Sequence, residues 1–118
     1  MQDKGKKLLE RIKKDRGFLR PFDPVLAEHD PDFLEIWHNL IMHALYREGA
    51  LPRKTKELIL VVLDAVTNQG GIRSHMRQAL EHGATEEEII EALELCSVLG
   101  VHHISALTDF AKEAQKSE

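Results

Sequence analysis

The chain has little sulfur and few aromatic rings: its 118 residues include one cysteine, Cys96, and 5% aromatic side chains. A lone thiol cannot form a disulfide within the chain, so this is not a disulfide-rich secreted scaffold. The first residues, MQDKGKK, lack the apolar core of a secretory signal. These absences lead us to expect a protein of the reducing cytoplasm.

Long apolar runs and a strong excess of one charge are also missing. The run Leu58–Leu63 is too short, and too closely flanked by charge, to span a membrane. A net charge of −4 gives no general attraction for nucleic acid or anionic lipid. The basic segment 2–16 contains Glu10 and Asp15 and no aromatics, which favours a solvated helix face over an anion-binding one. We expect neither nucleic acid nor a membrane as a partner.

What the sequence does contain is helical periodicity. No segment shows strand alternation or an internal repeat, so we predict an all-α bundle of about six helices in a single domain, 1–118. The helices are expected at 2–16, from Pro31 until Gly49, from Pro52 to near Thr67, from Ile72 to a cap at Gly83, after Thr85, and from Val101 to about Gln115, with a short turn at 25–29. The helix after Thr85 should break or kink at Gly100.

Local signals mark several of these helix ends. Asp30 before Pro31 is an N-cap acid followed by a proline at the first helical position. Thr85 with Glu88 three residues later forms a capping box. The helix over Leu58–Leu63 is apolar on nearly every side, which is typical of a buried helix.

Glu57 comes directly before the apolar run Leu58–Leu63, and His75 lies near the start of the next predicted helix. These two ionisable residues are the candidate catalytic pair. His75 lies at the edge of an apolar stripe, and its ordinary pKa allows it to donate or accept a proton near neutrality. Glu57 could orient that imidazole as a partly buried carboxylate, or could form an ordinary ion pair with Lys54, Arg53 or Arg73.

Three more residues are candidates for binding a substrate. Asp64 follows Glu57 at i+7 and shares roughly its face, where an acid needs either exposure or a partner. Arg73 and Asn68 lie at the start of the next helix, whose amides already favour an anion, although they also suit a surface arginine and a cap. Cys96 lies in an apolar helical stretch and suits a small core residue.

The histidines do not predict a metal site. Neighbours such as His102 and His103 diverge by about 100° on a helix. His75 and His82 share a face but are separated by roughly 10 Å of helical rise. We expect no metal, and Gly70-Gly71 lacks the context of a phosphate-binding loop.

Three segments together carry a family resemblance. They are L-P-R-K-T-K-E-L at 51–58, I-R-S-H-M-R at 72–77, and H-G-A-T-E-E-E-I-I-E-A-L at 82–93, the last followed by L-G-V. Their combination resembles the carboxymuconolactone decarboxylase / alkylhydroperoxidase D-like (AhpD-like) family over about 51–113, with 1–29 as an N-terminal helical extension. The resemblance implies a helical bundle with a central antiparallel helix pair and a homo-oligomer, commonly a trimer or hexamer.

The sequence departs from the peroxidatic branch of that family. That branch carries Cys-x-x-Cys, and counting back from His75 places Asn68 and Gly71 at the two cysteine positions. The interval from Glu57 to His75 is also one residue shorter than the family's usual one, which leaves the register of the loop at 67–71 open. Neither Asn68 nor Gly71 can form a thiolate, which argues against thiol peroxidase chemistry.

The decarboxylase branch also lacks these cysteines, and the resemblance to it implies a cofactor-independent protein acting on a small carboxylate or lactone by proton transfer. In that reading His75 donates the proton, Glu57 orients it, and Arg73 or the helix N-terminus holds the substrate anion. Two alternatives remain: an antioxidant that would have to use Cys96, and a non-catalytic oligomeric binding or scaffold protein of the same fold.

Overall fold

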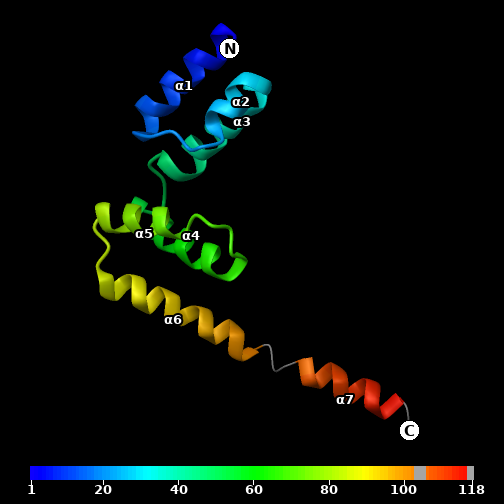
Figure 1. The fold of residues 1–118 in the computed structure, drawn as a ribbon. Helices are drawn as coiled ribbons and strands as arrows, with labels where there is room; N and C mark the ends of the chain where they lie inside the picture. The colour runs from blue at the N-terminus through cyan, green and yellow to red at the C-terminus, as the bar shows by residue number, and fades with distance from the viewer. Residues whose placement is uncertain (103–105, 117–118) are drawn as a thin grey trace. The chain divides into compact units, whose positions relative to one another are not determined.

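A computed structural model describes the backbone of residues 1–102 and 106–116, and the side chains of 1–98 and 106–116 (Figure 1). Every regular element in those ranges is a helix, which confirms the all-α prediction. The chain divides into two compact units, residues 1–47 and residues 48–118, which we describe separately. The expectation of a single domain stays a prediction.

The first unit contains α1 (Asp3–Arg16), α2 (Asp23–His29), α3 (Pro31–Ile41) and the π-helix η1 (Met42–Tyr46). Its core is formed by Leu8, Ile12, Ala27 and Leu34. The predicted cap of α3 is present, because the Asp30 carboxylate accepts a hydrogen bond from the Phe33 amide at 3.0 Å. The short turn expected at 25–29 is a full helix, α2, which begins two residues earlier.

The helix expected to reach Gly49 ends at Tyr46 instead, after changing from α to π geometry at Met42. Arg47 then adopts an extended backbone. The Tyr46 hydroxyl accepts a hydrogen bond from Arg16 Nε at 3.2 Å, which ties this last turn to the end of α1. This hydrogen bond joins residues 30 positions apart, so the local sequence around Tyr46 does not reveal it.

The second unit contains α4 (Arg53–Thr67), α5 (Ile72–Glu81), α6 (Glu86–His102) and α7 (Ala106–Lys116). Helices α4 and α5 are antiparallel: residue 53 pairs with 78, 57 with 75, and 64 lies beside 71. Helix α6 follows the predicted capping box, in which Thr85 and Glu88 exchange hydrogen bonds of 2.9 and 3.1 Å. A small core joins the three helices; it contains Ala79, Ala84 and Ile89, with Leu58, Met76 and Leu93 packed against it.

Two predictions about the later helices need correction. Gly100 neither ends nor breaks α6, which continues to His102, and the last helix begins at Ala106 rather than Val101. One glycine costs a helix only about 1 kcal/mol, which a long helix tolerates. The predicted cap at Gly83 is confirmed: this glycine follows the C-cap His82 with a left-handed φ of +97°, and the amides of Gly83 and Ala84 donate to the carbonyls of Leu80 and Ala79 at 3.2 and 2.9 Å. His103 lies outside the described residues.

The expectation that α4 is buried on nearly every side is wrong for this chain. Its buried positions are Glu57, Val61 and Asp64, while Ile59, Leu63 and Val66 are exposed. The reason is geometric: α4 packs mainly against α5 and α6, and the face toward α5 is the one that carries the two acids. No helix within the described ranges is long and apolar enough to cross a membrane.

The close approach of α1 and α2 at Gly5 gives a test of the first unit. A Cβ on Gly5 would lie 2.2 Å from the Ala27 carbonyl oxygen, a backbone atom that cannot move aside. We expect Gly5→Ala to lower the free energy of unfolding by about 1–3 kcal/mol through overpacking, despite the better helix propensity of alanine. Chemical denaturation followed by circular dichroism measures this, with exposed Lys6→Ala as the matched control. A Gly5→Ala variant as stable as that control would contradict the described packing.

Candidate functional site

The two candidate catalytic residues are in direct contact on the α4–α5 hairpin. Nδ1 of His75, in the first turns of α5, lies 2.9 Å from Oε2 of Glu57 on α4. The Glu57 side chain is completely buried, whereas 26% of the His75 side chain is exposed. The pair therefore consists of a covered carboxylate beneath an imidazole that reaches solvent.

The second oxygen of Glu57 is held by Arg53, one helical turn earlier on α4. Arg53 Nε donates to Glu57 Oε1 at 2.9 Å, and a second guanidinium nitrogen donates to the side-chain oxygen of Gln78 on α5 at 3.3 Å. The carboxylate is thus fixed from both sides, by the guanidinium and by the imidazole. Arg53 is one of the three ion-pair partners that the sequence analysis considered for Glu57.

The charge of Glu57 follows from these contacts. Burial works to raise the pKa of this carboxyl, but the hydrogen bonds from His75 and Arg53, together with the positive charge of Arg53, outweigh burial and hold the pKa below its ordinary value of 4.5. Glu57 is consequently ionised at neutral pH and can only accept hydrogen bonds.

The ionised carboxylate also determines the tautomer of His75. A 2.9 Å contact between Nδ1 and an acceptor-only carboxylate requires the proton to reside on Nδ1. In the neutral ring Nε2 is then a free base, and in the protonated ring Nε2 carries a transferable proton. The arrangement can therefore move a proton at Nε2 in either direction.

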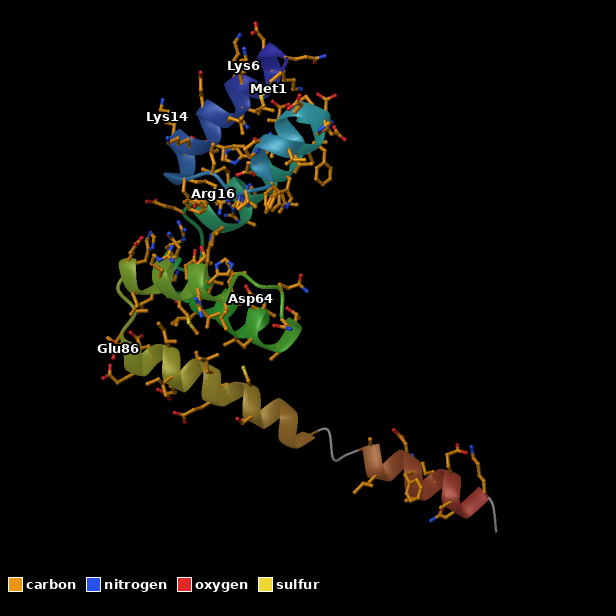
Figure 2. The ribbon with its side chains drawn as sticks, viewed as in Figure 1. Met1, Lys6, Lys14, Arg16, Asp64 and Glu86 are labelled. Carbon is orange, nitrogen blue, oxygen red and sulfur yellow. The ribbon has the colours of Figure 1, made fainter. Side chains whose placement is uncertain are left out.

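Asp64 lies two turns along α4 from Glu57 and is brought to the same region. A Cβ placed on Gly71 would be 2.8 Å from Oδ2 of Asp64 and 3.6 Å from Nε2 of His75. Asp64 is only 7% exposed, and Figure 2 labels it on the α4–α5 hairpin. The Asp64 carboxylate and the Nε2 edge of the imidazole therefore lie on the same side of Gly71.

The other two predicted binding residues do not join this cluster. Asn68 is exposed and follows the end of α4 in a left-handed conformation, φ 55°. Its backbone N–H donates a hydrogen bond to the backbone carbonyl of Asp64. Arg73 is exposed on α5, and its side chain makes no hydrogen bond or ion pair with any residue that the structure describes. Their predicted role in substrate binding stays a prediction.

Sequence reasoning did not find Gln78. The available signal was its i+3 spacing from His75 on the face of α5 that meets α4, which becomes informative only when the helix pairing is known. Cys96, the single thiol, lies partly buried on α6. Within the described part of the chain, no group of three or more potential ligands is placed to hold a metal ion.

The fold and the site define an all-α protein whose central helix hairpin holds a buried glutamate against a partly exposed histidine. The chain belongs to the carboxymuconolactone decarboxylase family, because the sequence profile of that family matches residues 31–113. This confirms the family resemblance seen in the sequence. The profile match begins at residue 31, the start of α3. The sequence motifs had indicated the resemblance only from about residue 51.

Two relatives show how far the similarity extends. The first, described as an uncharacterized 15.0 kDa protein in the nqo9–nqo10 intergenic region of Paracoccus denitrificans, is 31% identical over 118 residues, covering 85% of this chain and 84% of that protein. The second is a crystal structure from Burkholderia xenovorans LB400, provisionally described as a gamma-carboxymuconolactone decarboxylase subunit, with a TM-score of 0.76 and 31% identity. It matches 99% of this chain, which spans 48% of that protein's length.

The lowered pKa of Glu57 predicts how stability depends on pH. Because the folded-state pKa lies below the ordinary 4.5, the ionised carboxylate stabilises the fold above that pH, and this contribution is lost as pH falls through the folded pKa. We expect Glu57→Gln to lower the free energy of unfolding by about 2 kcal/mol at pH 7, and the difference from wild type to shrink below pH 4.5.

Urea denaturation at a series of pH values measures both quantities, with Glu94→Gln, an exposed acid on α6, as the control. A Glu57→Gln variant that matches wild type at pH 7, or that differs by the same amount at every pH, would show that the carboxylate is not held by charged partners.

Proposed function

We propose that this protein is a cytoplasmic, cofactor-independent decarboxylase-like enzyme that acts on a small carboxylate or lactone by proton transfer at His75. The observation that carries the proposal is the Glu57–His75 contact at 2.9 Å, which leaves Nε2 as the atom able to exchange a proton. Membership of the carboxymuconolactone decarboxylase family supports the reaction class.

The chemical step needs little more than this pair. In a substrate whose carboxylate lies β to a lactone carbonyl, the C–C bond to the carboxylate breaks and carbon dioxide leaves. The electron pair moves into the carbonyl and forms an enolate, and protonated Nε2 of His75 then delivers a proton to carbon. Glu57 stabilises the imidazolium before the transfer and keeps the ring in position. Water returns the proton to Nε2.

The substrate carboxylate needs a positive anchor within reach of Nε2. The start of α5 is suited to this, since its first turn has no side-chain cap among the described residues and its amides point outward. We place Arg73 beside that turn as a second anchor and Asn68 at the edge of the site.

Self-association forms part of the proposal. Three apolar side chains on α4 are exposed, namely Ile59, Leu63 and Val66. An exposed group of apolar side chains is typical of a surface that binds another protein. Covering them with further copies of the chain would also reduce water access near the hairpin. We propose a homo-oligomer, a trimer or hexamer, as the active form.

The antioxidant alternative is disfavoured because Asn68 and Gly71 stand where the peroxidatic branch has its two cysteines. The only cysteine, Cys96, lies on α6, whereas the Glu57–His75 pair is on α4 and α5. A peroxidatic thiol depends on a neighbouring base or positive charge to form its thiolate. The second alternative is a non-catalytic scaffold or binding protein of the same fold. The turnover experiment below distinguishes it from an enzyme.

Turnover of carboxymuconolactone-type lactones tests the proposed chemistry. We expect His75→Ala to lower kcat by about 10²- to 10⁴-fold, because general acid catalysis contributes that much. The measurement is release of carbon dioxide by purified protein over a panel of small carboxylated lactones. His29→Ala, an exposed histidine in the first unit, is the matched control and should keep the wild-type rate.

Absence of wild-type turnover across the panel would favour the scaffold. Equal rates for wild type and His75→Ala would remove the imidazole from the mechanism. Either result contradicts the proposal.

A further inference from the structure

The buried charge of Glu57 has two positive partners, and the proposed mechanism uses only one of them. The Glu57 side chain is completely buried, and a buried carboxylate requires a compensating positive charge. If His75 were the only partner, the imidazole ring would have to carry both protons to supply that charge. Arg53 removes this requirement, because its guanidinium contacts Oε1 of Glu57 at 2.9 Å and stays protonated in proteins.

Both helices of the hairpin hold the Arg53 guanidinium at the carboxylate. Arg53 precedes Glu57 by one turn of α4, and its second contact, at 3.3 Å, is the side-chain oxygen of Gln78 on α5. Gln78 follows His75 by three residues on the face of α5 that meets α4. Only 18% of the Arg53 side chain is exposed. The guanidinium is therefore a fixed charge rather than a mobile surface one.

The geometry points to Arg53 as a positioning residue that neutralises Glu57, so that the His75 ring can both take up and release a proton at Nε2. This inference rests on the proposed proton transfer at His75 and adds a residue to it. With Arg53 present, the three groups together are neutral when the ring is neutral. Without Arg53, the remaining two would be neutral only when the ring is protonated, and burial favours the neutral combination. An imidazolium held by an unshared carboxylate would also be a weaker acid, which would slow proton delivery to carbon.

The other charged groups around the hairpin do not take the place of Arg53. Asp64, also on α4 and only 7% exposed, lies with Nε2 of His75 on the same side of Gly71, where it adds to the negative charge around the ring. Lys54 of α4 is paired with Glu88 of α6 at 3.1 Å. Two arginines of α5 are exposed, where solvent and salt screen their charge, namely Arg73 and Arg77.

The charge state of the His75 ring tests this role without any substrate. Arg53→Gln removes the positive charge but keeps an amide donor for Glu57, whereas Arg53→Lys keeps the charge. We expect the ratio of doubly to singly protonated His75 rings at pH 7, measured by ¹⁵N NMR on the folded full chain, to rise about tenfold in Arg53→Gln. The ratio should stay close to that of wild type in Arg53→Lys and in the matched control Arg77→Gln, which changes an exposed arginine of α5.

A second measurement uses the unaltered chain, so it decides the question even if Arg53→Gln does not fold. Arg53 Nε–H and His75 Nδ1–H donate to the same carboxylate, each at 2.9 Å. The Arg53 Nε–H resonance of wild type should therefore shift with pH along the same curve as the His75 ring resonances. An Arg53 resonance that stays constant while the ring titrates overturns the inference.

An unchanged ring ratio in Arg53→Gln overturns it as well. So does an equal rise in Arg53→Lys, which would show that contact geometry rather than charge matters. These outcomes are distinct from failure of the proposed function. A ring ratio that follows the charge at position 53 in a protein without turnover would support the charge balance and contradict only the proposed chemistry, whereas turnover with an unchanged ratio would contradict only the role of Arg53.

Discussion

The rest of the structure depends on how one buried carboxylate is compensated. Glu57 is completely covered in the middle of the α4–α5 hairpin, and an unpaired charge at that position would oppose folding of the hairpin itself. Arg53 from the same helix and His75 from the next one each take one oxygen, at 2.9 Å. The same contacts that allow the two helices to pack also fix the proton of His75 on Nδ1. Structural stability and the proposed chemistry therefore rest on one set of hydrogen bonds.

Much of this could be predicted from the sequence. Helical periodicity and the signals at Asp30 and Thr85 gave the fold class and several helix ends, because caps act locally. The pairing of Glu57 with His75 was also predicted, although its support came from family resemblance rather than periodicity. The end of α3, the exposed face of α4 and the role of Gln78 were not predictable, since each depends on which helices pack together.

The site also shows what lies beside His75 in a chain without the Cys-x-x-Cys motif. Gly71, the position reached by counting four residues back from His75, lies close to Nε2 of that histidine. A Cβ there would lie 3.6 Å from the imidazole and only 2.8 Å from Oδ2 of Asp64, so a larger residue would require the Asp64 side chain to shift. The histidine and its glutamate are thus in contact, and the neighbouring position 71 has no side chain. This arrangement suits proton transfer to a bound molecule and does not suit attack by a thiol.

The most direct test of this account is the protonation of the His75 ring, measured by ¹⁵N NMR on the folded protein near neutral pH. The account predicts a proton on Nδ1, with a strongly downfield resonance that reflects its hydrogen bond to Glu57 and disappears in Glu57→Gln. A neutral ring with its proton on Nε2, or a ring spectrum that Glu57→Gln leaves unchanged, would contradict it.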